Sequence, residues 1–378
     1  MDDIRVLIVD DSSMMRNLIG KIVDATEGLT VADKAMNGRF ALQKLDRVDP
    51  DAIVLDIEMP EMNGLEFLKE LKTRGIKIPT IVLSSLATEG ARVTMDCLDM
   101  GAVDFITKPS NQVNINEVAQ QLSSMLLVYG RKYRIRKGSS SGSTGTSTFA
   151  SSSTSMPSKE TSRPSFASTF GSKVEVAKPT PVRSPSNIQI IAIGISTGGP
   201  NALRQVFAGL DENLGQPIVV VQHMPAGFTE EFAKSLNKIC PLEVKEAAEG
   251  DIIKKGRVLI APGGKHLTVE KRSLATIAHI TDAPPKNGHK PSVGVLFESV
   301  TKEYQNHALG IIMTGMGKDG AEALRDMYVE GARTLGQDEV SSVVYGMPRV
   351  AWELGGVMKQ VSLDDMASTI NSYSKNFA

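Results

Sequence analysis

Three segments of this chain carry residue types that together perform nucleophilic catalysis. Ser196 lies in Gly194–Pro200, which fits the pattern G-x-S-x-G and follows the apolar run Ile190–Ile193. A serine in this pattern sits on a sharp strand-to-helix turn, which presents its hydroxyl as a nucleophile. His223 and Asp319 stand downstream on two further loops that contain proline or glycine. The combination of serine, histidine and aspartate predicts acyl transfer.

The histidine and the aspartate each follow an apolar run. His223 comes after Ile218–Val221, so it can act as general base for a serine at the end of an adjacent strand. Asp319 comes after Leu309–Met313 and a glycine-rich turn, and a carboxylate there would fix the tautomer of the histidine. The order Ser, His, Asp along the chain differs from the Ser, Asp, His order of α/β-hydrolases and disfavours that fold.

Each of these residues also has a simpler interpretation. Ser196 could be only a helix N-cap, and the glycine-rich turn around it could instead cradle a phosphate, although its spacing is not G-x-G-x-x-G. Asp319 could complement the dipole of a following helix. His266 could line the same cleft, whereas His279 and His307 are expected to be structural or exposed to solvent. No histidine pair has helical metal-ligand spacing, so no zinc is expected.

A second group of chemically active side chains stands in the first part of the chain. Asp10 and Asp11 end one predicted strand and Asp56 ends another, so three carboxylates converge if these strands are neighbours. Such a cluster is repulsive unless a hard cation such as Mg²⁺ offsets it. Ser84 and Lys108 end the next two predicted strands and could hold the oxygens of a phosphoryl group. Exposure of loops to solvent explains a single acidic residue at the end of a strand, but it does not explain three carboxylates together with Ser84 and Lys108.

The elements that position these residues alternate between short apolar runs and segments of helical period. The helical segments include Gly64–Lys72 and Val93–Met100. This alternation predicts parallel sheets with helices on both faces, and ligands at the carboxyl ends of the strands. The predicted strands are Val6–Val9, Ile53–Leu55, Thr80–Leu83, Val103–Ile106, Ile190–Ile193, Ile218–Val221, Val258–Ile260 and Leu309–Met313.

A stretch dominated by Ser, Thr, Gly and Pro separates the two α/β halves. Residues 138–187 cannot bury enough apolar surface to offset their ordering entropy, so they are expected to form a flexible linker. The basic residues just before them are interpreted as a solvated helix end. The sequence thus predicts a domain over 1–125, a helix end and linker over 126–187, and a second domain over 188–378.

Length, charge and cysteine content indicate what kind of partner the protein binds and in which cellular compartment it works. A length of 378 residues indicates at least two domains, and a net charge of −1 gives no reason to expect nucleic acid as a partner. The two cysteines, Cys97 and Cys240, are too few for a disulfide framework and favour a reducing compartment. The acidic start is not a signal peptide, and no apolar run is long enough to span a membrane. We expect a soluble, cytoplasmic protein without direct membrane insertion.

The first half resembles a response-regulator receiver domain, which is a doubly wound, flavodoxin-like fold. The resemblance rests on Asp10-Asp11, Asp56–Pro60, Gly64, Ser84, Phe105 and Lys108-Pro109. It implies that Asp56 accepts a phosphoryl group from a chemotaxis histidine kinase. It also implies that Asp11, Asp56 and the carbonyl of Glu58 hold Mg²⁺, with Asp10 close by. Ser84 and Phe105 would couple phosphorylation to a shape change, although an isolated aromatic is more often part of the core.

The second half resembles the catalytic domain of the CheB-type chemotaxis methylesterases, a Rossmann-like serine hydrolase domain. The matching segments are Gly194–Pro200, Gln222–Pro225, Ala261–His266, Pro291–Phe297, Thr314–Ala321 and Gln337–Pro348. The resemblance implies phosphorylation-activated hydrolysis of glutamate methyl esters on chemoreceptors, with deamidation of glutamines, in chemotactic adaptation. Ser196 would be the nucleophile, His223 the base and Asp319 the orienting acid. Backbone N–H groups of Met316 and Thr197 would bind the oxyanion, and no cofactor is expected for the esterase chemistry.

Some residues depart from the pattern of this family, and other functions remain open. Lys290, Gly294 and Ile195 stand where arginine, aspartate and a smaller residue are commoner, which leaves the contacts to the substrate open. One alternative is a phosphorylation-controlled binding module that has lost activity. Another is a serine hydrolase that acts on small esters. Release of methanol from methylated receptor membranes distinguishes these alternatives from the methylesterase.

Overall fold

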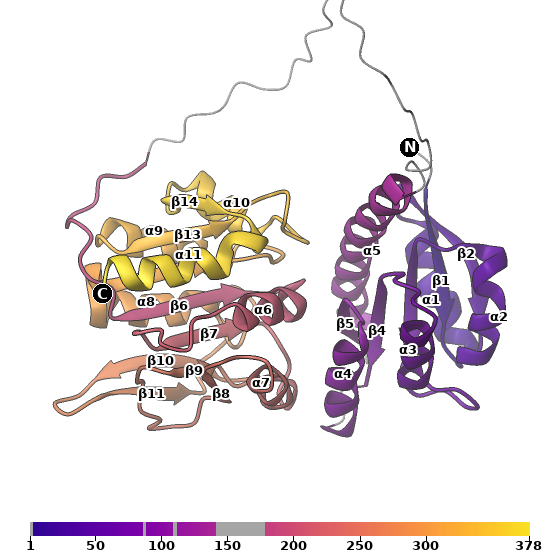
Figure 1. Cartoon of the computed structure of the whole chain (residues 1–378), viewed down its shortest axis with the longest axis horizontal. Coiled ribbons are helices and arrows are strands. Elements are labelled where there is room, and N and C mark those ends of the chain that lie inside the picture. Colours follow the sequence, from indigo (N-terminus) through magenta and orange to yellow (C-terminus); the bar gives the residue numbers. More distant parts are fainter. Residues whose placement is uncertain (1–2, 86–87, 109–111, 141–177) are drawn as a thin grey trace, which may run out of the picture.

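A computed structural model describes residues 3–85, 88–108, 112–140 and 178–378 of the chain. It contains two α/β domains, each built on a parallel sheet, in agreement with the predicted fold class (Figure 1). Much of the segment predicted to be a linker, residues 141–177, lies outside the described residues, as does Pro109.

The N-terminal domain has a five-stranded parallel sheet in the order β2-β1-β3-β4-β5, which is the flavodoxin-like order. The strands β1 and β3 are neighbours, so the residues that follow them meet at one edge of the sheet. The strands are β1 (Ile4–Val9), β2 (Leu29–Ala35), β3 (Ala52–Asp56), β4 (Thr80–Ser84) and β5 (Asp104–Thr107). The helices are α1 (Ser13–Asp24), α2 (Gly38–Val48), α3 (Gly64–Thr73), α4 (Thr88–Met100) and α5 (Gln112–Ser140).

The C-terminal domain has a seven-stranded parallel sheet in the order β14-β13-β12-β6-β7-β9-β8, and a separate antiparallel hairpin of β10 and β11. Its first four strands are β6 (Ile190–Ile195), β7 (Ile218–Gln222), β8 (Glu243–Glu246) and β9 (Arg257–Ile260). The others are β10 (His266–Lys271), β11 (Thr276–Thr281), β12 (Ala308–Ile312), β13 (Arg333–Gln337) and β14 (Lys359–Val361). Its helices are α6 (Gly199–Ala208), α7 (Phe228–Asn237), α8 (Val293–Tyr304), α9 (Ala321–Val329), α10 (Met347–Glu353) and α11 (Leu363–Asn376), with a 3₁₀ turn at Gln305–His307.

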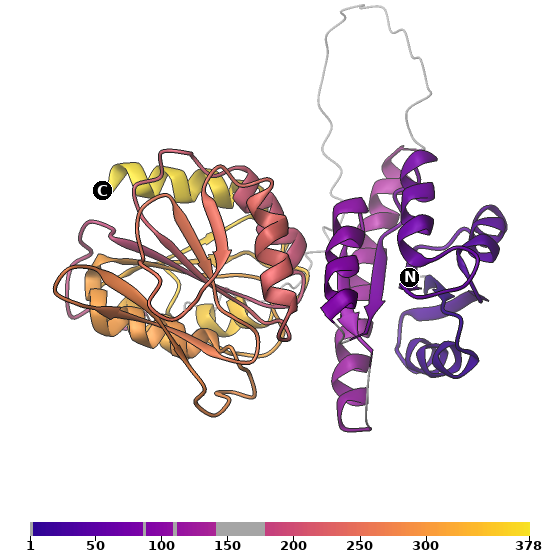
Figure 2. The ribbon, with the colours of Figure 1, turned by 90° about the horizontal axis from the view of Figure 1, so that it is seen from below.

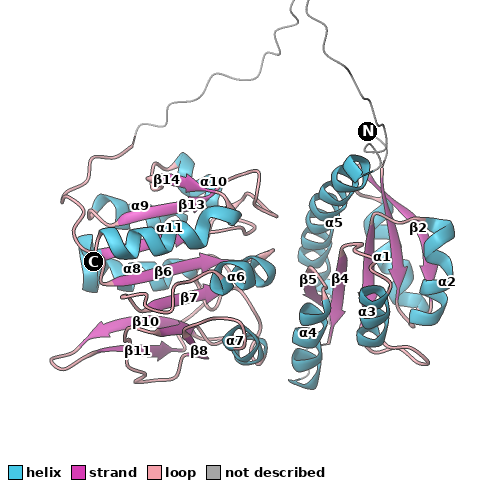
Figure 3. Cartoon of the chain, in the orientation of Figure 1, coloured by secondary structure: helices cyan, strands magenta, loops and turns pink. Residues whose placement is uncertain are grey.

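Helices cover both faces of the C-terminal sheet (Figures 2 and 3). One buried apolar cluster includes α6, α7 and α11, and another includes α8, α9 and α10. The strands β6, β7 and β9 follow one another toward one edge of the sheet, and β12, β13 and β14 follow one another toward the other edge. The order of the strands therefore switches between β6 and β12, which are hydrogen-bonded neighbours. Ligands of open parallel sheets bind outside the carboxyl ends of the strands at this switch point. The loops that follow β6, β7 and β12 are therefore expected to meet there.

The contact between the two domains includes β5 and α4 on one side and α6 and α7 on the other (Figure 1). The rings of Phe105 and Phe228 stack with centroids 5.1 Å apart and planes 6° from parallel. Asp99 forms an ion pair with Arg204 at 2.5 Å and accepts a hydrogen bond from Ser235 Oγ at 3.1 Å. One buried apolar cluster continues across this contact from α4 to α7.

A buried carboxylate of the N-terminal domain also reaches the loop after Ser196. Asp104 Oδ2 accepts a hydrogen bond of 2.8 Å from the backbone N–H of Gly198, the N-cap residue of α6. Burial raises the pKa of Asp104 to about 7, against the opposing effect of hydrogen bonds from the N–H groups of Phe105 and Gly198. The contact thus joins the sheet of the N-terminal domain directly to the first turn of the helix that follows the candidate nucleophile.

The strands expected from the apolar runs are all present, with ends that differ by one or two residues. The apolar pattern did not predict β2, β8, β10, β13 or β14, which are shorter, more polar or set apart from the main sheet. The helix α5 runs without a break past residue 125 to Ser140. Residues 178–187, within the stretch interpreted as linker, contact the C-terminal domain, for example through Val182 N–H to Val329 O at 2.7 Å. Among the described residues, no helix has the length and apolar character needed to cross a membrane.

Candidate active site

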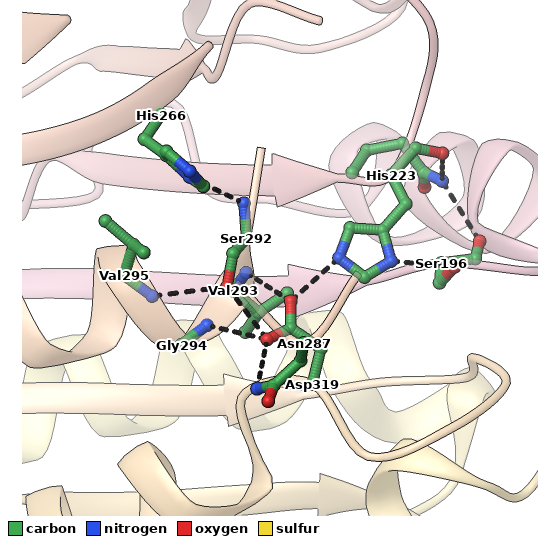
Figure 4. Close-up of polar contacts among 10 residues, drawn as sticks. Ser196, His223, His266, Asn287, Ser292, Val293, Gly294, Val295 and Asp319 are labelled. Atoms are coloured by element: carbon green, nitrogen blue, oxygen red, sulfur yellow. Dashed lines mark hydrogen bonds and ion pairs between the residues drawn. The ribbon is translucent and has the colours of Figure 1, made fainter. Parts of the chain in front are cut away.

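The structure brings Ser196, His223 and Asp319 together at the switch point (Figure 4). Ser196 is the first residue after β6, and its N–H donates to the carbonyl of Thr314 at 2.9 Å. The N-cap of α6 is Gly198, so the interpretation of Ser196 as only a helix cap is wrong. The side chain of Ser196 instead contacts His223, and the serine is only 9% exposed.

The imidazole of His223 bridges the serine and the aspartate. Its Nδ1 lies 3.1 Å from Ser196 Oγ, and its Nε2 lies 3.0 Å from Asp319 Oδ2. A neutral ring that carries its proton on Nε2 donates to the carboxylate and leaves Nδ1 to accept the serine proton. The ring thus uses Nδ1 toward the nucleophile, opposite to the orientation in the serine-protease template, where Nε2 has that role.

Asp319 is almost fully buried and accepts several hydrogen bonds besides that of His223. Its donors are Ser292 Oγ at 2.8 Å, Val293 N–H at 2.7 Å and Gly294 N–H at 3.3 Å. Burial alone would raise the pKa of Asp319. The bond and charge of His223, with further hydrogen bonds from side chains, outweigh burial and hold this pKa well below its usual range.

The helix whose N-terminus stabilises Asp319 is not the one that follows it in sequence. Asp319 directly precedes Gly320, the N-cap of α9, which suggested a role in complementing the dipole of that helix. Its oxygens instead accept from the first N–H groups of α8, whose N-cap is Ser292. A helix N-terminus favours a negative charge, so α8 helps to keep Asp319 ionised.

Several polar residues at the site were not predicted from the sequence. Asn287 Nδ2 donates to Asp319 Oδ1 at 3.1 Å, beside the bond from Ser292 (Figure 4). Gln222 Nε2 donates to the carbonyls of Ser196 at 3.0 Å and His223 at 3.1 Å, so it ties the two loops together. Gln222 ends β7 directly before His223. Its position next to the candidate base is the feature of the sequence that could have indicated a role at the site.

The backbone around the serine leaves two N–H groups available. In the part of the chain that the structure describes, the N–H groups of Thr197 and Met316 donate no hydrogen bond. The loop of Met316 approaches Ser196 closely at Gly315, where an added Cβ would lie 2.8 Å from Ser196 Cβ. Glycine at this position therefore lets the loop that carries Met316 approach the serine. Unpaired N–H groups next to a nucleophile are suited to bind an oxyanion.

The remaining histidines considered from the sequence lie outside the triad. His266 is fully buried, and its Nδ1 accepts from the N–H of Ser292 at 3.1 Å while its Nε2 faces the carbonyl of Pro284 at 3.1 Å. It holds the backbone before α8 and does not contact Ser196. His279 lies on β11 of the hairpin and pairs with Glu249, which lies between β8 and β9. His307 forms a hydrogen bond with Asn187 at the start of the domain.

The acidic residues of the N-terminal domain do converge. Carboxylate oxygens of Asp10, Asp11 and Asp56 lie within 4.8 Å of one another, and Lys108 Nζ lies 2.7 Å from Asp56 Oδ1. Burial, followed by the charge of Asp56, raises the pKa of Asp10 to about 6. Burial also raises the pKa of Asp56, although Lys108 opposes it. The Oδ2 atoms of Asp10 and Asp56 are buried and accept no hydrogen bond from the residues that the structure describes, so these oxygens are suited to bind a hard cation.

The residues expected to support this acidic site lie around it. The hydroxyl of Ser84 is buried and lies 2.6 Å from Thr94 Oγ1 in α4. Phe105 is only partly buried and stacks on the C-terminal domain, which is not the behaviour of a simple core residue. The side chain of Glu58 accepts from Ser85 Oγ at 3.3 Å, and metal binding by its carbonyl stays a prediction.

The departures from the expected family pattern occupy defined environments. Lys290 forms an ion pair with Asp282. Gly294 contributes its N–H to Asp319 at 3.3 Å. Ile195 is fully buried as the last residue of β6. None of the three interrupts the bonds among Ser196, His223 and Asp319.

Fold and site together define a class of protein. It joins a receiver-like domain with an acidic cluster to an α/β domain in which a serine, a histidine and an aspartate are hydrogen-bonded in series. The family model "CheB methylesterase" matches residues 191–370, and the family model "Response regulator receiver domain" matches residues 6–120. The chain belongs to the CheB methylesterase family and carries an N-terminal receiver domain.

Curated relatives match the whole chain. A protein-glutamate methylesterase/protein-glutamine glutaminase of Treponema denticola is 69% identical over 380 residues, covering 100% of both chains. The protein of the same name in Treponema pallidum is 54% identical over 397 residues, covering 100% of this chain and 98% of its own. Among solved structures, the catalytic domain of Thermotoga maritima CheB methylesterase is 33% identical with a TM-score of 0.48, covering 49% of this chain and 98% of its own.

Proposed function

We propose that this protein hydrolyses glutamate methyl esters on chemoreceptors and deamidates specific receptor glutamines. Its full-length relatives are named for these two activities. The observation that carries the proposal is the series of hydrogen bonds from Ser196 Oγ to His223 Nδ1 and from His223 Nε2 to Asp319 Oδ2. A series of this kind activates a hydroxyl for attack on a carbonyl carbon.

The reaction proceeds through an acyl-enzyme. Ser196 Oγ attacks the ester carbonyl while its proton moves to His223 Nδ1, and Asp319 stabilises the resulting imidazolium. The N–H groups of Thr197 and Met316 bind the oxyanion, and removal of one such donor typically costs about 3–4 kcal/mol. His223 returns the proton to the leaving oxygen, so that methanol departs. Water, deprotonated by His223, then releases the glutamate. With a glutamine side chain the same steps release ammonia.

The receiver domain regulates this activity by phosphorylation. Asp56 accepts the phosphoryl group from a chemotaxis histidine kinase, and Ser84 and Lys108 bind its oxygens. Asp10, Asp11, Asp56 and the carbonyl of Glu58 would hold Mg²⁺, which fits the buried Oδ2 atoms of Asp10 and Asp56, since neither accepts a hydrogen bond within the described residues. The ion supplies positive charge that offsets the carboxylates and the phosphoryl group. Two free cysteines, which require no oxidising environment, support a cytoplasmic location.

Replacing Asp56 by asparagine is expected to abolish stimulation by a phosphodonor and leave the basal activity in place. Asparagine lacks the nucleophilic carboxylate oxygen, while the triad in the other domain is unchanged. Methanol release from methylated receptor membranes, measured with and without a small-molecule phosphodonor, checks this result. Asp46→Asn, on the exposed side of α2, serves as the matched control. An Asp56→Asn protein that is still stimulated would move phosphorylation to another residue.

The interdomain contact is proposed to restrict access to Ser196 in the unphosphorylated protein. The contact includes Gly198, two residues after the serine, and Phe228 at the start of α7. Ser84 is bonded to Thr94 in α4, and α4 contacts α7. If the Ser84 hydroxyl turns toward the phosphoryl group, its hydrogen bond to Thr94 is lost. Loss of this bond weakens the packing of α4, and with it the contact between α4 and α7.

Deletion of residues 1–137 is therefore expected to raise basal methanol release severalfold, because the covering domain is removed. In the full-length protein, Asp99→Lys should have the same direction of effect, since it places a cation beside Arg204 and Lys238. Asp46→Lys, with the same charge change on α2, should leave basal activity unaltered. If neither the deletion nor Asp99→Lys increases basal activity, the receiver does not restrict access to the serine.

A further inference from the structure

A tight turn places a second histidine against the catalytic imidazole. Asn287 and Gly288 both have left-handed backbone angles, with φ of 53° and 79°. The flanking residues exchange two backbone hydrogen bonds, from Lys286 N–H to His289 O at 3.1 Å and from His289 N–H to Lys286 O at 2.9 Å. An Asn-Gly pair with positive φ at both positions is typical of the two-residue type I′ turn. The turn sends Asn287 toward Asp319 and His289 toward His223.

The contact between the two histidines is face to face. The ring centroids of His223 and His289 are 4.0 Å apart, and the planes are 11° from parallel. Neither ring nitrogen of His289 makes a hydrogen bond to any residue in the described part of the chain. The ring of His289 therefore contributes its π face, and not a donor or an acceptor, to the site.

His289 is a neutral ring near pH 7. Burial, with the nearby charge of His223 as the second cause, lowers the pKa of His289 to about 4. A neutral aromatic face attracts a cation, whereas a second imidazolium would repel it. During the reaction His223 becomes an imidazolium, and the face it presents to His289 then lies against a neutral π system.

We propose that His289 is a positioning residue for the esterase reaction, acting through His223. Its ring holds the plane of the imidazole so that Nδ1 stays directed at Ser196 Oγ and Nε2 at Asp319. It also favours the imidazolium that forms when the serine proton is transferred. In this role His289 itself gains and loses no proton, and it acts on the reaction only through the ring of His223. The inference rests on the proposed function of Ser196, His223 and Asp319.

The test is a set of variants in the full-length protein, assayed by methanol release from methylated receptor membranes with a phosphodonor present. His289→Ala should lower kcat by about tenfold or more with KM changed less than about twofold, because positioning of the base acts on the chemical step. His289→Phe, which keeps an aromatic face without ring nitrogens, should retain kcat within about threefold of the wild type. His279→Ala, an exposed histidine on β11, is the matched control and should not change kcat. Thermal unfolding of each variant verifies that the fold is intact.

Each outcome separates this inference from the proposed function. If the wild type and the His279→Ala protein release no methanol, the proposed function is wrong, and the inference about His289 is wrong with it. If both are active and folded His289→Ala has wild-type kcat, His289 does not position the base. If His289→Phe is as impaired as His289→Ala, the ring nitrogens matter and the stacking role is overturned. An equal rise of KM in both variants would assign His289 to substrate binding and would equally overturn it.

Discussion

Methanol release from methylated receptors is expected to fall by a factor on the order of 10⁴ to 10⁶ when Ser196 is replaced by alanine. Ser196 Oγ lies 3.1 Å from His223 Nδ1 and is the proposed nucleophile. The methyl side chain of alanine cannot attack a carbonyl carbon. The fold should remain intact, because Ser196 holds its loop through its backbone N–H to Thr314. Turnover measured with a phosphodonor, together with thermal unfolding, checks both expectations.

A serine elsewhere in the same domain provides the control. Ser372 lies exposed on α11, and Ser372→Ala should release methanol at the wild-type rate. Substantial turnover by a folded Ser196→Ala protein would mean that water or another residue attacks the ester. The family membership would stand in that case, but the role of Ser196 would not.

Replacing Asp319 by asparagine is expected to lower kcat by a factor on the order of 10⁴, as removal of the charge of a triad carboxylate does. Asp319 receives His223 Nε2–H, the hydroxyl of Ser292 and two N–H groups at the start of α8. An amide at this position can turn its NH₂ toward His223 or toward these donors, and either arrangement misdirects the imidazole. The steady-state rate of methanol release by Asp319→Asn is the measurement.

The same variant also tests whether Asp319 is mainly structural. Loss of the buried anion removes a partner of the α8 N-terminus, so some loss of stability is expected as well. Ser292→Ala removes one donor and the N-cap of α8 but keeps the carboxylate. It should lose stability with a much smaller loss of kcat than Asp319→Asn. Equal kcat for Asp319→Asn and Ser292→Ala, both folded, would reassign Asp319 to stabilisation of the helix.

The general fold and the three residues of the site could be predicted from the sequence for a simple physical reason. Buried parallel strands appear as continuous apolar runs, and their carboxyl ends meet at one edge of the sheet. Ser196, His223 and Asp319 each follow such a run, and the three strands concerned are contiguous in the sheet. The same logic brought Asp10 and Asp56 together, because β1 and β3 are neighbours.

The surroundings of the triad could not be predicted in this way, because they depend on contacts between distant segments. Asn287, His289 and Ser292 lie in a loop that precedes α8 and has no apolar pattern. The Asn-Gly pair was a signal for a tight turn, but nothing local shows that the turn faces His223. The helix that stabilises Asp319 is α8 and not the adjacent α9, since packing and not sequence proximity determines which N-terminus reaches the carboxylate.

The contacts of Phe105 and Asp104 with the second domain could likewise not be predicted from the sequence. Only the presence of the second domain explains the contact of Phe105 with Phe228 and the hydrogen bond of Asp104 with Gly198. Contacts between domains follow from the shapes of two surfaces and leave no periodic pattern in either sequence.

The most direct measurement on the proposed chemistry is the covalent labelling of the nucleophile. The full-length protein, treated with a phosphodonor and a phosphonylating reagent, would be digested and its labelled peptide identified by mass spectrometry. An oxygen that becomes nucleophilic only through its hydrogen-bonded histidine should carry the label, so we expect modification at residue 196, in parallel with loss of methanol release, and none in a His223→Ala protein. Modification of a different residue, or full inactivation with residue 196 unmodified, would contradict the account.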